Sequence, residues 1–355
     1  MVQAEQEAVI LQKAGLITIG KRPIPEIEDP NDVKVQIKAT GICGSDVHYY
    51  KTGAIGDFVV KEPMVLGHES SGVVVEVGSK VQNVKVGDRV AIEPGIPSRY
   101  SEETMSGHYN LCPHMRFCAT PPYDGTLLKY FLVPKDFVYK LEDHVSFEEG
   151  AIVEPLSVAV HANKLAKTTF GNVAVVFGAG PVGLLTGATA SAFGALEIVF
   201  IDIFEHKLER AKQFKATHAL RWKPHEKEAD IVKEISKALG GRKPDVVFEC
   251  SGAESCIRAA VKVCNRGGSI VQVGMGKDDV LFPITELGVK ELTFHGSFRY
   301  YKGDYKDAVS LITTGKIDVR PLITRRFPFA EAVEAYKYNV DHAAEITKTI
   351  IEGPE

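Results

Sequence analysis

Apolar and polar residues alternate with a period of two in the first part of the chain. Val33, Val35 and Ile37 are separated by charged or amide residues, and shorter apolar runs follow at residues 73–77 and 90–92. This alternation, with turn residues between the runs, is typical of half-buried strands. We therefore predict a β-rich domain of short strands and long loops from residue 30 to about residue 140.

The pattern changes near residue 158, where apolar strands begin to alternate with amphipathic helices. We predict strands at residues 173–177, 197–201, 246–248 and 269–273, and helices at 181–193, 205–214, 230–239 and 254–263. Such alternation builds a doubly wound parallel sheet, so the fold class is α/β. The last part of the chain returns to mixed structure, with predicted helices at residues 305–313 and 330–338.

Residues 168–196 carry no charge, which also fits a membrane helix. However, this stretch is rich in glycine, contains Pro181, and has only short apolar runs. A strand, turn and helix buried in a parallel sheet explain it better, because such strands are covered on both faces.

Composition narrows the function classes without choosing among them. The 355 residues are enough for two domains, and the apolar and charged fractions of 45% and 25% are ordinary for a globular protein. A net charge of −4 with mixed signs makes nucleic acid and anionic membranes poor partners. Irregularly spaced cysteines argue against a disulfide framework, and Glu5 and Glu7 argue against an export signal. We therefore expect a cytoplasmic protein.

A dinucleotide-binding motif follows the first predicted parallel strand. In VVFGAGPVG, Gly178, Gly180 and Gly183 have the spacing that permits a tight turn, close approach of a pyrophosphate, and close packing of helix on strand. The phosphates would lie at the N-terminus of the helix that begins near Pro181. The glycine pattern alone is weak evidence, but its place between a strand and a helix makes it specific.

Asp202 ends the next predicted strand. A carboxylate there accepts hydrogen bonds from the ribose hydroxyls of NAD and repels the 2′-phosphate of NADP, and no arginine follows it. We therefore predict NAD as the cofactor. Lys207 is close enough to help bind the cofactor, although a solvated lysine on the surface of the helix is nearly as good an interpretation.

Cys43 and the adjacent pair His68 and Glu69 provide a thiol, an imidazole and a carboxylate, each a type of zinc ligand. Taken singly, each has an ordinary structural explanation as a small buried residue, a core histidine and a strand-end acid. Together they match a catalytic zinc, which has three protein ligands and one open position. Glu154 is a further carboxylate in an apolar stretch near the presumed domain junction, where a metal or its water would compensate the charge.

The segments GICGSDVHYY, VLGHESSG, EPLSVAVHA, GAGPVG and GSFRYYKGDYKDAV resemble the zinc-dependent polyol dehydrogenases of the medium-chain dehydrogenase/reductase superfamily. Within that family, the chain resembles fungal xylitol dehydrogenase and sorbitol dehydrogenase, and the resemblance extends over nearly its whole length. The resemblance implies a GroES-like catalytic domain at residues 1–157, completed by residues 296–355. It also implies a Rossmann-type NAD-binding domain at residues 158–295 and a homotetramer.

The resemblance also implies roles for individual residues. Zinc ligands fall on Cys43, His68 and Glu69, with Glu154 as a further ligand or as the acid that holds a water molecule. Ser45 matches the start of a proton relay, although a turn serine that bonds its own backbone is equally consistent. The proton would leave through Ser45, the ribose hydroxyls of the cofactor and His48, or through water held by Glu154. The substrate contacts are Tyr49, Phe117, Glu154, Arg299 and Tyr300, and the nicotinamide-lining positions are Val182, Val273, Met275, Ser297 and Phe298.

One segment departs from the family pattern. Many relatives bind a second, structural zinc through four cysteines, and that spacing falls here on Ser98, Ser101, Thr104 and Cys112. Neutral hydroxyls bind zinc poorly, so we expect a metal-free loop and one zinc per chain.

The predicted function is NAD-dependent oxidation of a secondary alcohol of a polyol to a ketose, either xylitol to D-xylulose or sorbitol to fructose. The sequence does not separate the two substrates. Two alternatives remain open: a zinc alcohol dehydrogenase for another substrate class, and an NAD(H)-binding protein without catalytic activity.

Overall fold

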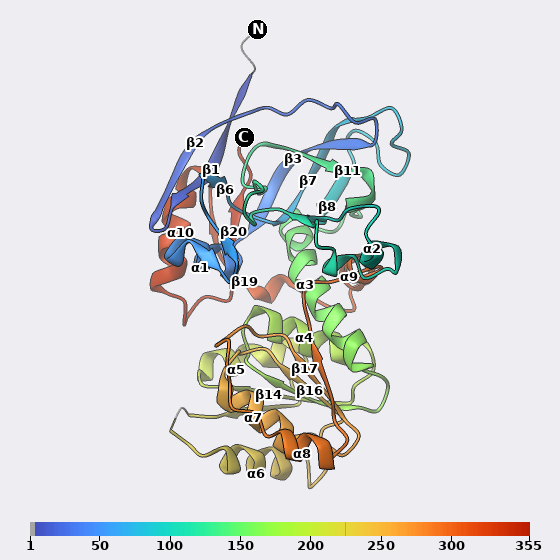
Figure 1. Ribbon diagram of the computed structural model, residues 1–355, viewed down its shortest axis with the longest axis vertical. Coiled ribbons are helices and arrows are strands. Elements are labelled where there is room, and N and C mark those ends of the chain that lie inside the picture. The colour runs from blue at the N-terminus through green and yellow to red at the C-terminus, as the bar shows by residue number, and fades with distance from the viewer. Residues whose placement is uncertain (1–3, 224) are drawn as a thin grey trace. The chain divides into compact units, whose positions relative to one another are not determined.

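The computed structural model describes residues 4–223 and 225–355, which form two compact units (Figure 1). The first unit comprises the chain through Glu154 together with Tyr301–Thr313 and Leu322–Glu355. The second comprises Pro155–Tyr300 and Thr314–Pro321. Helix α3 (Phe147–Ala166) contains the boundary between the two units and has Pro155 in its interior.

A mixed sheet forms the centre of the first unit, in the strand order β12-β8-β7-β3-β20-β19, with β11 also paired to β3. Its strands are β3 (Asp32–Gly41), β7 (Glu69–Val77), β8 (Arg89–Ile92), β11 (Tyr130–Pro134), β12 (Val138–Lys140), β19 (Ile323–Phe327) and β20 (Lys348–Glu352). In Figure 1 the red β20 lies beside the blue β3, so the C-terminal segment completes a sheet begun near the N-terminus. Alternate valines of β3 are fully buried, as the period-two pattern predicts.

A second sheet in this unit contains β1 (Glu5–Lys13), β2 (Leu16–Pro23) and β6 (Met64–Val65). Four short strands form two separate pairs: β4 (Ala54–Ile55) with β5 (Phe58–Val59), and β9 (Gly95–Ile96) with β10 (Arg116–Phe117). The helices of the unit are α1 (Gly44–Thr52), α2 (Glu102–Met105), α9 (Asp304–Thr313) and α10 (Ala332–Asp341). Apolar residues of β1, β6, α1 and α10 share one core, which joins the two ends of the chain.

The second unit is a parallel sheet in the order β15-β14-β13-β16-β17-β18. Its strands are β13 (Val173–Phe177), β14 (Glu197–Asp202), β15 (His218–Arg221), β16 (Val246–Glu249), β17 (Ser269–Gln272) and β18 (Thr293–Gly296). The connecting helices are α4 (Pro181–Ala192), α5 (Glu205–Ala211), α6 (Glu228–Ala238), α7 (Glu254–Val263) and α8 (Ile284–Val289). Strand order reverses between β13 and β16, which makes the carboxyl ends of these two strands the expected ligand crevice.

The uncharged stretch that also fitted a membrane span is β13, a turn and α4. Every residue of β13 is buried, as expected for a central strand of a parallel sheet. Among the described residues, we find no helix with the combination of length and apolar character that crossing a membrane requires.

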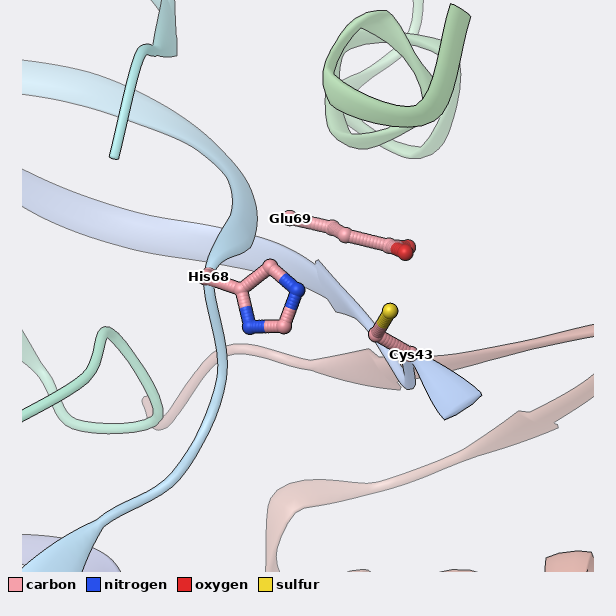
Figure 2. A group of neighbouring side chains, drawn as sticks. All are labelled: Cys43, His68 and Glu69. Atoms are coloured by element: carbon pink, nitrogen blue, oxygen red, sulfur yellow. The ribbon is translucent and has the colours of Figure 1, made fainter. Parts of the chain in front are cut away.

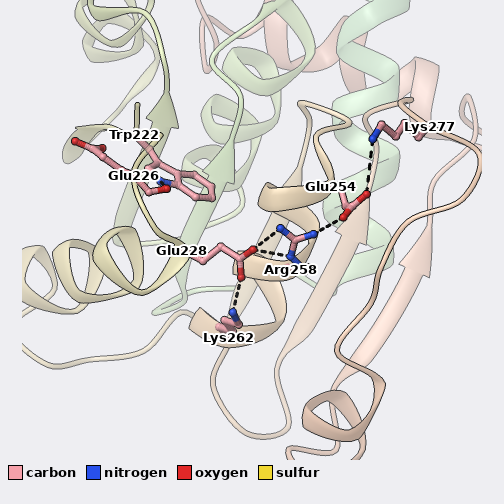
Figure 3. Close-up of polar contacts among 7 residues, drawn as sticks. All are labelled: Trp222, Glu226, Glu228, Glu254, Arg258, Lys262 and Lys277. Atoms are coloured by element: carbon pink, nitrogen blue, oxygen red, sulfur yellow. Dashed lines mark hydrogen bonds and ion pairs between the residues drawn. The ribbon is translucent and has the colours of Figure 1, made fainter. Parts of the chain in front are cut away.

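An ion-pair network joins α6 to α7 in the second unit (Figure 3). Arg258 pairs with Glu228 at 2.5 Å and with Glu254, and Lys262 also pairs with Glu228. All four side chains are partly exposed, so each pair contributes about 1 kcal/mol or less to stability.

Candidate metal centre and dinucleotide site

Antiparallel pairing of β3 with β7 brings the predicted zinc ligands together in the first unit. Gly41, the last residue of β3, lies opposite Glu69, the first residue of β7, and Cys43 follows two residues later as the N-cap of α1. A Cβ atom on residue 41 would lie 2.1 Å from Oε2 of Glu69, so only glycine leaves room for this carboxylate. The pairing register therefore places the thiol beside the imidazole and the carboxylate.

One ligand atom from each of Cys43, His68 and Glu69 lies within 4.8 Å of the others. Figure 2 shows the sulfur, the carboxylate and one ring nitrogen directed toward a common space. Zinc bonds of about 2.0 to 2.3 Å place tetrahedral ligand atoms roughly 3.5 Å apart, so small side-chain shifts bring all three onto one ion. Their chemistry and spacing fit a zinc with an open fourth position. These three form the group that the described part of the chain offers to a metal.

Asp46 orients His68 from the first turn of α1. The carboxylate of Asp46 is fully buried, and its Oδ1 lies 3.3 Å from Nδ1 of the imidazole. Burial opposes protonation of His68, but the charges of Asp46 and Cys43 outweigh it and raise the pKa of His68 well above its ordinary value. A carboxylate on one ring nitrogen fixes the imidazole so that the other nitrogen faces the metal. Our sequence interpretation missed Asp46, although it stands three residues after Cys43.

Lys348, the first residue of β20, holds the carboxylate of Glu69. Its Nζ donates to Oε1 at 2.6 Å, to Oε2 at 2.7 Å and to the carbonyl of Ile42 at 3.0 Å. Burial alone would lower the pKa of Lys348, but the charges of Glu69 and Cys43 raise it, so the lysine is a cation. Each carboxylate oxygen keeps a second lone pair for a metal. Nothing in the local sequence indicated this lysine.

Glu154 lies in α3 and is 6% exposed. Its carboxylate is not part of the three-residue group. Its charge nevertheless acts on Glu93 and Lys348, where it contributes to the raised pKa values of both groups. The structure thus places Glu154 near the site but not among the clustered ligand atoms.

The remaining predicted residues of the first unit have different surroundings. The ring of Phe117 lies 5.7 Å from the ring of His68, whereas Tyr49 is 3% exposed and packs in the apolar core. Ser45 is partly exposed in the first turn of α1. His48 is exposed, with Nδ1 3.1 Å from the hydroxyl of Thr52. Phe117 therefore packs beside the candidate ligand His68.

The second unit contains the predicted dinucleotide motif in its expected local structure. Gly178 directly follows β13 and has a φ of 95°, which favours glycine, and Gly180 is the N-cap of α4, with Pro181 in the first turn. Asp202 accepts hydrogen bonds from the amides of Ala179 at 2.8 Å and Phe204 at 2.9 Å. The same carboxylate that would meet the ribose thus also holds the glycine-rich turn. Lys207 places its Nζ 5.0 Å above the ring of Phe204.

The predicted nicotinamide-lining residues follow the carboxyl ends of the parallel strands or begin the helix after β13. Val182, Val273 and Ser297 are partly buried, whereas Met275 and Phe298 are 75% and 45% exposed. Arg299 has a positive φ of 54° and places its guanidinium 4.7 Å above the ring of Phe298, and the neighbouring Tyr300 is buried.

The chain matches two family models. The alcohol dehydrogenase GroES-like domain covers residues 29–143, and the zinc-binding dehydrogenase domain covers residues 181–314. These matches confirm the predicted fold class of a GroES-like β-rich domain with a Rossmann-type sheet.

Individual proteins also match over the full length. Sorbitol dehydrogenase 1 of Saccharomyces cerevisiae is 60% identical over 357 residues, which cover 100% of both chains. A D-xylulose reductase of the same yeast is 58% identical over 352 residues, covering 99% of this chain and 98% of that protein. Among solved structures, L-idonate 5-dehydrogenase from Escherichia coli superposes with a TM-score of 0.90 at 30% identity, covering 99% of each chain.

Proposed function

The chain belongs to the zinc-dependent polyol dehydrogenases, and from this membership and its site we propose that it oxidises a secondary alcohol of a polyol to a ketose with NAD. One observation carries the proposal: a thiol, an imidazole and a carboxylate converge in a chain that also carries a complete dinucleotide-binding fold. We assign catalysis to residues 1–157 with 296–355, and NAD binding to residues 158–295.

A zinc ion held by Cys43, His68 and Glu69 would supply a Lewis acid that lowers the pKa of the substrate hydroxyl. Asp46 keeps the imidazole of His68 in the ligating orientation, and Lys348 keeps Glu69 in place. We propose that Ser45, His48 or water held by Glu154 carries the released proton.

We also assign the cofactor and substrate contacts from family membership and from the positions of the residues in the fold. Gly178, Gly180, Gly183 and the N-terminus of α4 would receive the pyrophosphate, and Asp202 the ribose hydroxyls. Arg299 and Tyr300 supply donors suited to a polyhydroxylated substrate, and Tyr49 and Phe117 complete the proposed substrate contacts.

Xylitol and sorbitol are the two substrates to compare, because the similar yeast proteins are named for sorbitol and for D-xylulose. A panel of five- and six-carbon polyols, assayed with NAD and NADP on protein of measured zinc content, tests the proposal. Reduction of NAD with these polyols, and little with simple primary alcohols, is the expected result. Activity confined to simple alcohols would favour an alcohol dehydrogenase of another substrate class.

The variant Cys43→Ser separates an enzyme from an NAD(H)-binding protein without catalysis. We expect it to lose zinc and turnover while it retains NADH affinity, because Cys43 and the glycine-rich turn belong to different units. NADH binding by the parent chain without turnover of any polyol would favour the non-catalytic alternative.

We further propose that the chain is a homo-oligomer, a tetramer by resemblance, which uses the free edge of β18. The nearby side chains of Leu281, Ile284 and Val289 are 74%, 66% and 63% exposed, and Phe294 on the edge strand is 37% exposed. Apolar residues beside an unpaired strand edge are costly unless another chain covers them. Light scattering should show an oligomer in the parent and a smaller species in Ile284→Glu. A monomeric parent would contradict the proposal.

A cytoplasmic location is also proposed. The cysteines of the chain are all free thiols in the structure, as a reducing compartment permits. Fractionation of cells that express a tagged chain tests this point.

A further inference from the structure

Glu249 and Gln272 occupy the last positions of β16 and β17 and lie opposite each other in the parallel register. Strand β16 borders the point at which the strand order of the sheet reverses. Glu249 is fully buried, so its charge must be compensated by hydrogen bonds or by an opposite charge.

The carboxylate of Glu249 is surrounded by donors. It accepts hydrogen bonds from the amide of Ser251 at 2.9 Å, the amide of Gly252 at 2.9 Å, the hydroxyl of Ser251, and Nε2 of Gln272 at 2.7 Å. Charge-assisted hydrogen bonds of this kind are stronger than neutral ones. Glu249 therefore fixes the turn at residues 250–252.

The same residue also fixes the turn that follows β17. The carbonyl of Glu249 accepts from the amides of Val273 and Gly274, each at 2.8 Å. The amide of Gln272, held by the Glu249 carboxylate, donates at 2.7 Å to the carbonyl of Gly274. A single buried carboxylate thus connects both turns at the carboxyl ends of β16 and β17.

These turns pack directly against the glycine-rich turn and against each other. A Cβ on residue 178 would lie 3.0 Å from the amide nitrogen of Ser251, and a Cβ on residue 252 would lie 2.2 Å from the carbonyl oxygen of Met275. Backbone contact this close means that displacement of residues 250–252 also displaces Gly178 and Met275.

We propose that Glu249, through Gln272, is a positioning residue for the cofactor crevice. It holds the backbone against which the glycine-rich turn packs, and it holds the segment that carries Val273 and Met275. The inference rests on the proposed NAD-dependent function and adds residues that touch no reacting atom. A crevice fixed before binding saves the free energy of ordering these turns around the cofactor.

Glu249→Gln tests this role. The substitution replaces one carboxylate oxygen by an NH₂ donor. The amides of Ser251 and Gly252, one facing each oxygen, cannot accept a hydrogen bond, so one of the two is lost. We expect NADH to bind about tenfold more weakly. Affinity is measured through energy transfer from Trp222, the single tryptophan, whose backbone amide bonds the carbonyl of Asp202 at 3.1 Å. Thermal unfolding without ligand is measured in parallel, and titrations use temperatures at which each variant is fully folded.

Glu228→Gln is the matched control. It makes the same chemical change in the same unit, but in the ion-pair network of α6 and α7 (Figure 3). We expect it to change NADH affinity less than about twofold. Glu249→Asp keeps the charge on a side chain one methylene shorter, and its affinity should lie between those of the parent and Glu249→Gln.

The possible results distinguish failure of this inference from failure of the proposed function. A folded Glu249→Gln variant with parental NADH affinity would overturn the inference, even if its unfolding temperature falls, because a purely structural role predicts that result. If Glu249→Gln does not fold, Gln272→Ala decides: weaker NADH binding supports the inference, and parental affinity overturns it. A parent chain that binds no NADH would overturn the proposed function and this inference together. Polyol oxidation by the parent with both variants unaffected would overturn this inference alone.

Discussion

The ammonium nitrogen of Lys348 lies 2.6 Å and 2.7 Å from the two carboxylate oxygens of Glu69, and the two residues are 4% and 1% exposed as side chains. A candidate metal ligand is thus already neutralised by a buried cation from the C-terminal strand. The arrangement keeps the anionic ligand in place whether or not a metal shares its charge.

Lys348→Met should destabilise the metal-free chain by about 3 to 5 kcal/mol, because Glu69 becomes an uncompensated buried charge. Zinc then compensates that charge alone, so the gain in unfolding temperature on adding zinc should be larger in the variant than in the parent. Calorimetry with and without zinc measures this difference.

Lys34→Met is the control for that experiment, because Lys34 pairs with Glu76 at 2.5 Å on the same sheet but Glu76 is half-exposed. We expect a change of about 1 kcal/mol or less that zinc does not alter. An equal response to zinc in Lys348→Met and the parent would contradict the assigned role of Lys348.

Asp202→Ala should shift cofactor selectivity toward NADP, since the carboxylate that repels a 2′-phosphate is removed. We expect the ratio of kcat/KM for NADP to that for NAD to rise about tenfold or more. NAD affinity should also fall, because Ala179 loses its acceptor. Steady-state kinetics with both cofactors provides the measurement. The exposed Glu205→Gln, three residues away, should leave the ratio unchanged, and unchanged selectivity in Asp202→Ala would refute the assignment.

In the loop at residues 98–112, hydroxyl residues stand at three of the four positions of the predicted four-cysteine spacing, and Cys112 stands at the fourth. Sγ of Cys112 accepts from the amide of Ser98 at 3.3 Å, and the hydroxyls of Ser101 and Thr104 lie 3.0 Å apart. Burial alone would raise the pKa of Cys112, but hydrogen bonds from Ser101, His114, Ser98 and Thr104 lower it. The positions predicted from the four-cysteine spacing therefore surround one thiol.

Ser98→Cys, Ser101→Cys and Thr104→Cys combined should create a second zinc site and raise the unfolding temperature, since four thiolates can enclose a zinc ion. Metal analysis should find one zinc per parent chain and two per variant chain. Adding Cys112→Ser to the triple variant should remove the second ion. Two tightly bound zinc ions in the parent would show that the hydroxyl residues do not prevent binding.

Glu93 should give the protein a measurable pH dependence of stability. Burial raises the pKa of Glu93 from 4.5 to about 7. Hydrogen bonds from Tyr109 and Tyr139 lower this pKa in part, and the negative charges of Asp304 and Glu154 raise it further. The folded state therefore holds this proton more tightly than the unfolded state. Its stabilising contribution is complete below pH 4.5 and is lost as the pH rises through 7, by about 3 kcal/mol.

Glu93→Gln should remove that component. Denaturant unfolding at pH 5 and pH 8 should show a smaller loss of stability in the variant than in the parent over this interval. Identical pH dependence in both proteins would mean that Glu93 does not titrate as described.

Local sequence patterns predicted most of the second unit. The strand Val173–Phe177 and the helix Glu254–Val263 have the predicted bounds, and the other predicted elements there differ by a few residues at their ends. These elements have hydrophobic periods and turn residues that act within a few positions, so a short window of sequence contains the information. The first unit was predicted as a β-rich region with two helices near the C-terminus, which correspond to α9 and α10. Helix α3, which has Pro155 in its interior, was not predicted.

The sequence by itself determined the ligand types at residues 43, 68 and 69, the glycine-rich turn with Asp202, and the loss of three cysteines from the loop at residues 98–112. The tertiary structure alone decided which groups support them. Lys348 and Glu69 are 279 positions apart, and they meet because β20 and β7 both pair with β3 in a particular register. Glu249 reaches Gln272 and the glycine-rich turn through the parallel register of the second sheet. The sequence specifies the type of each side chain, but the pairing register between distant strands is fixed only when the whole core packs.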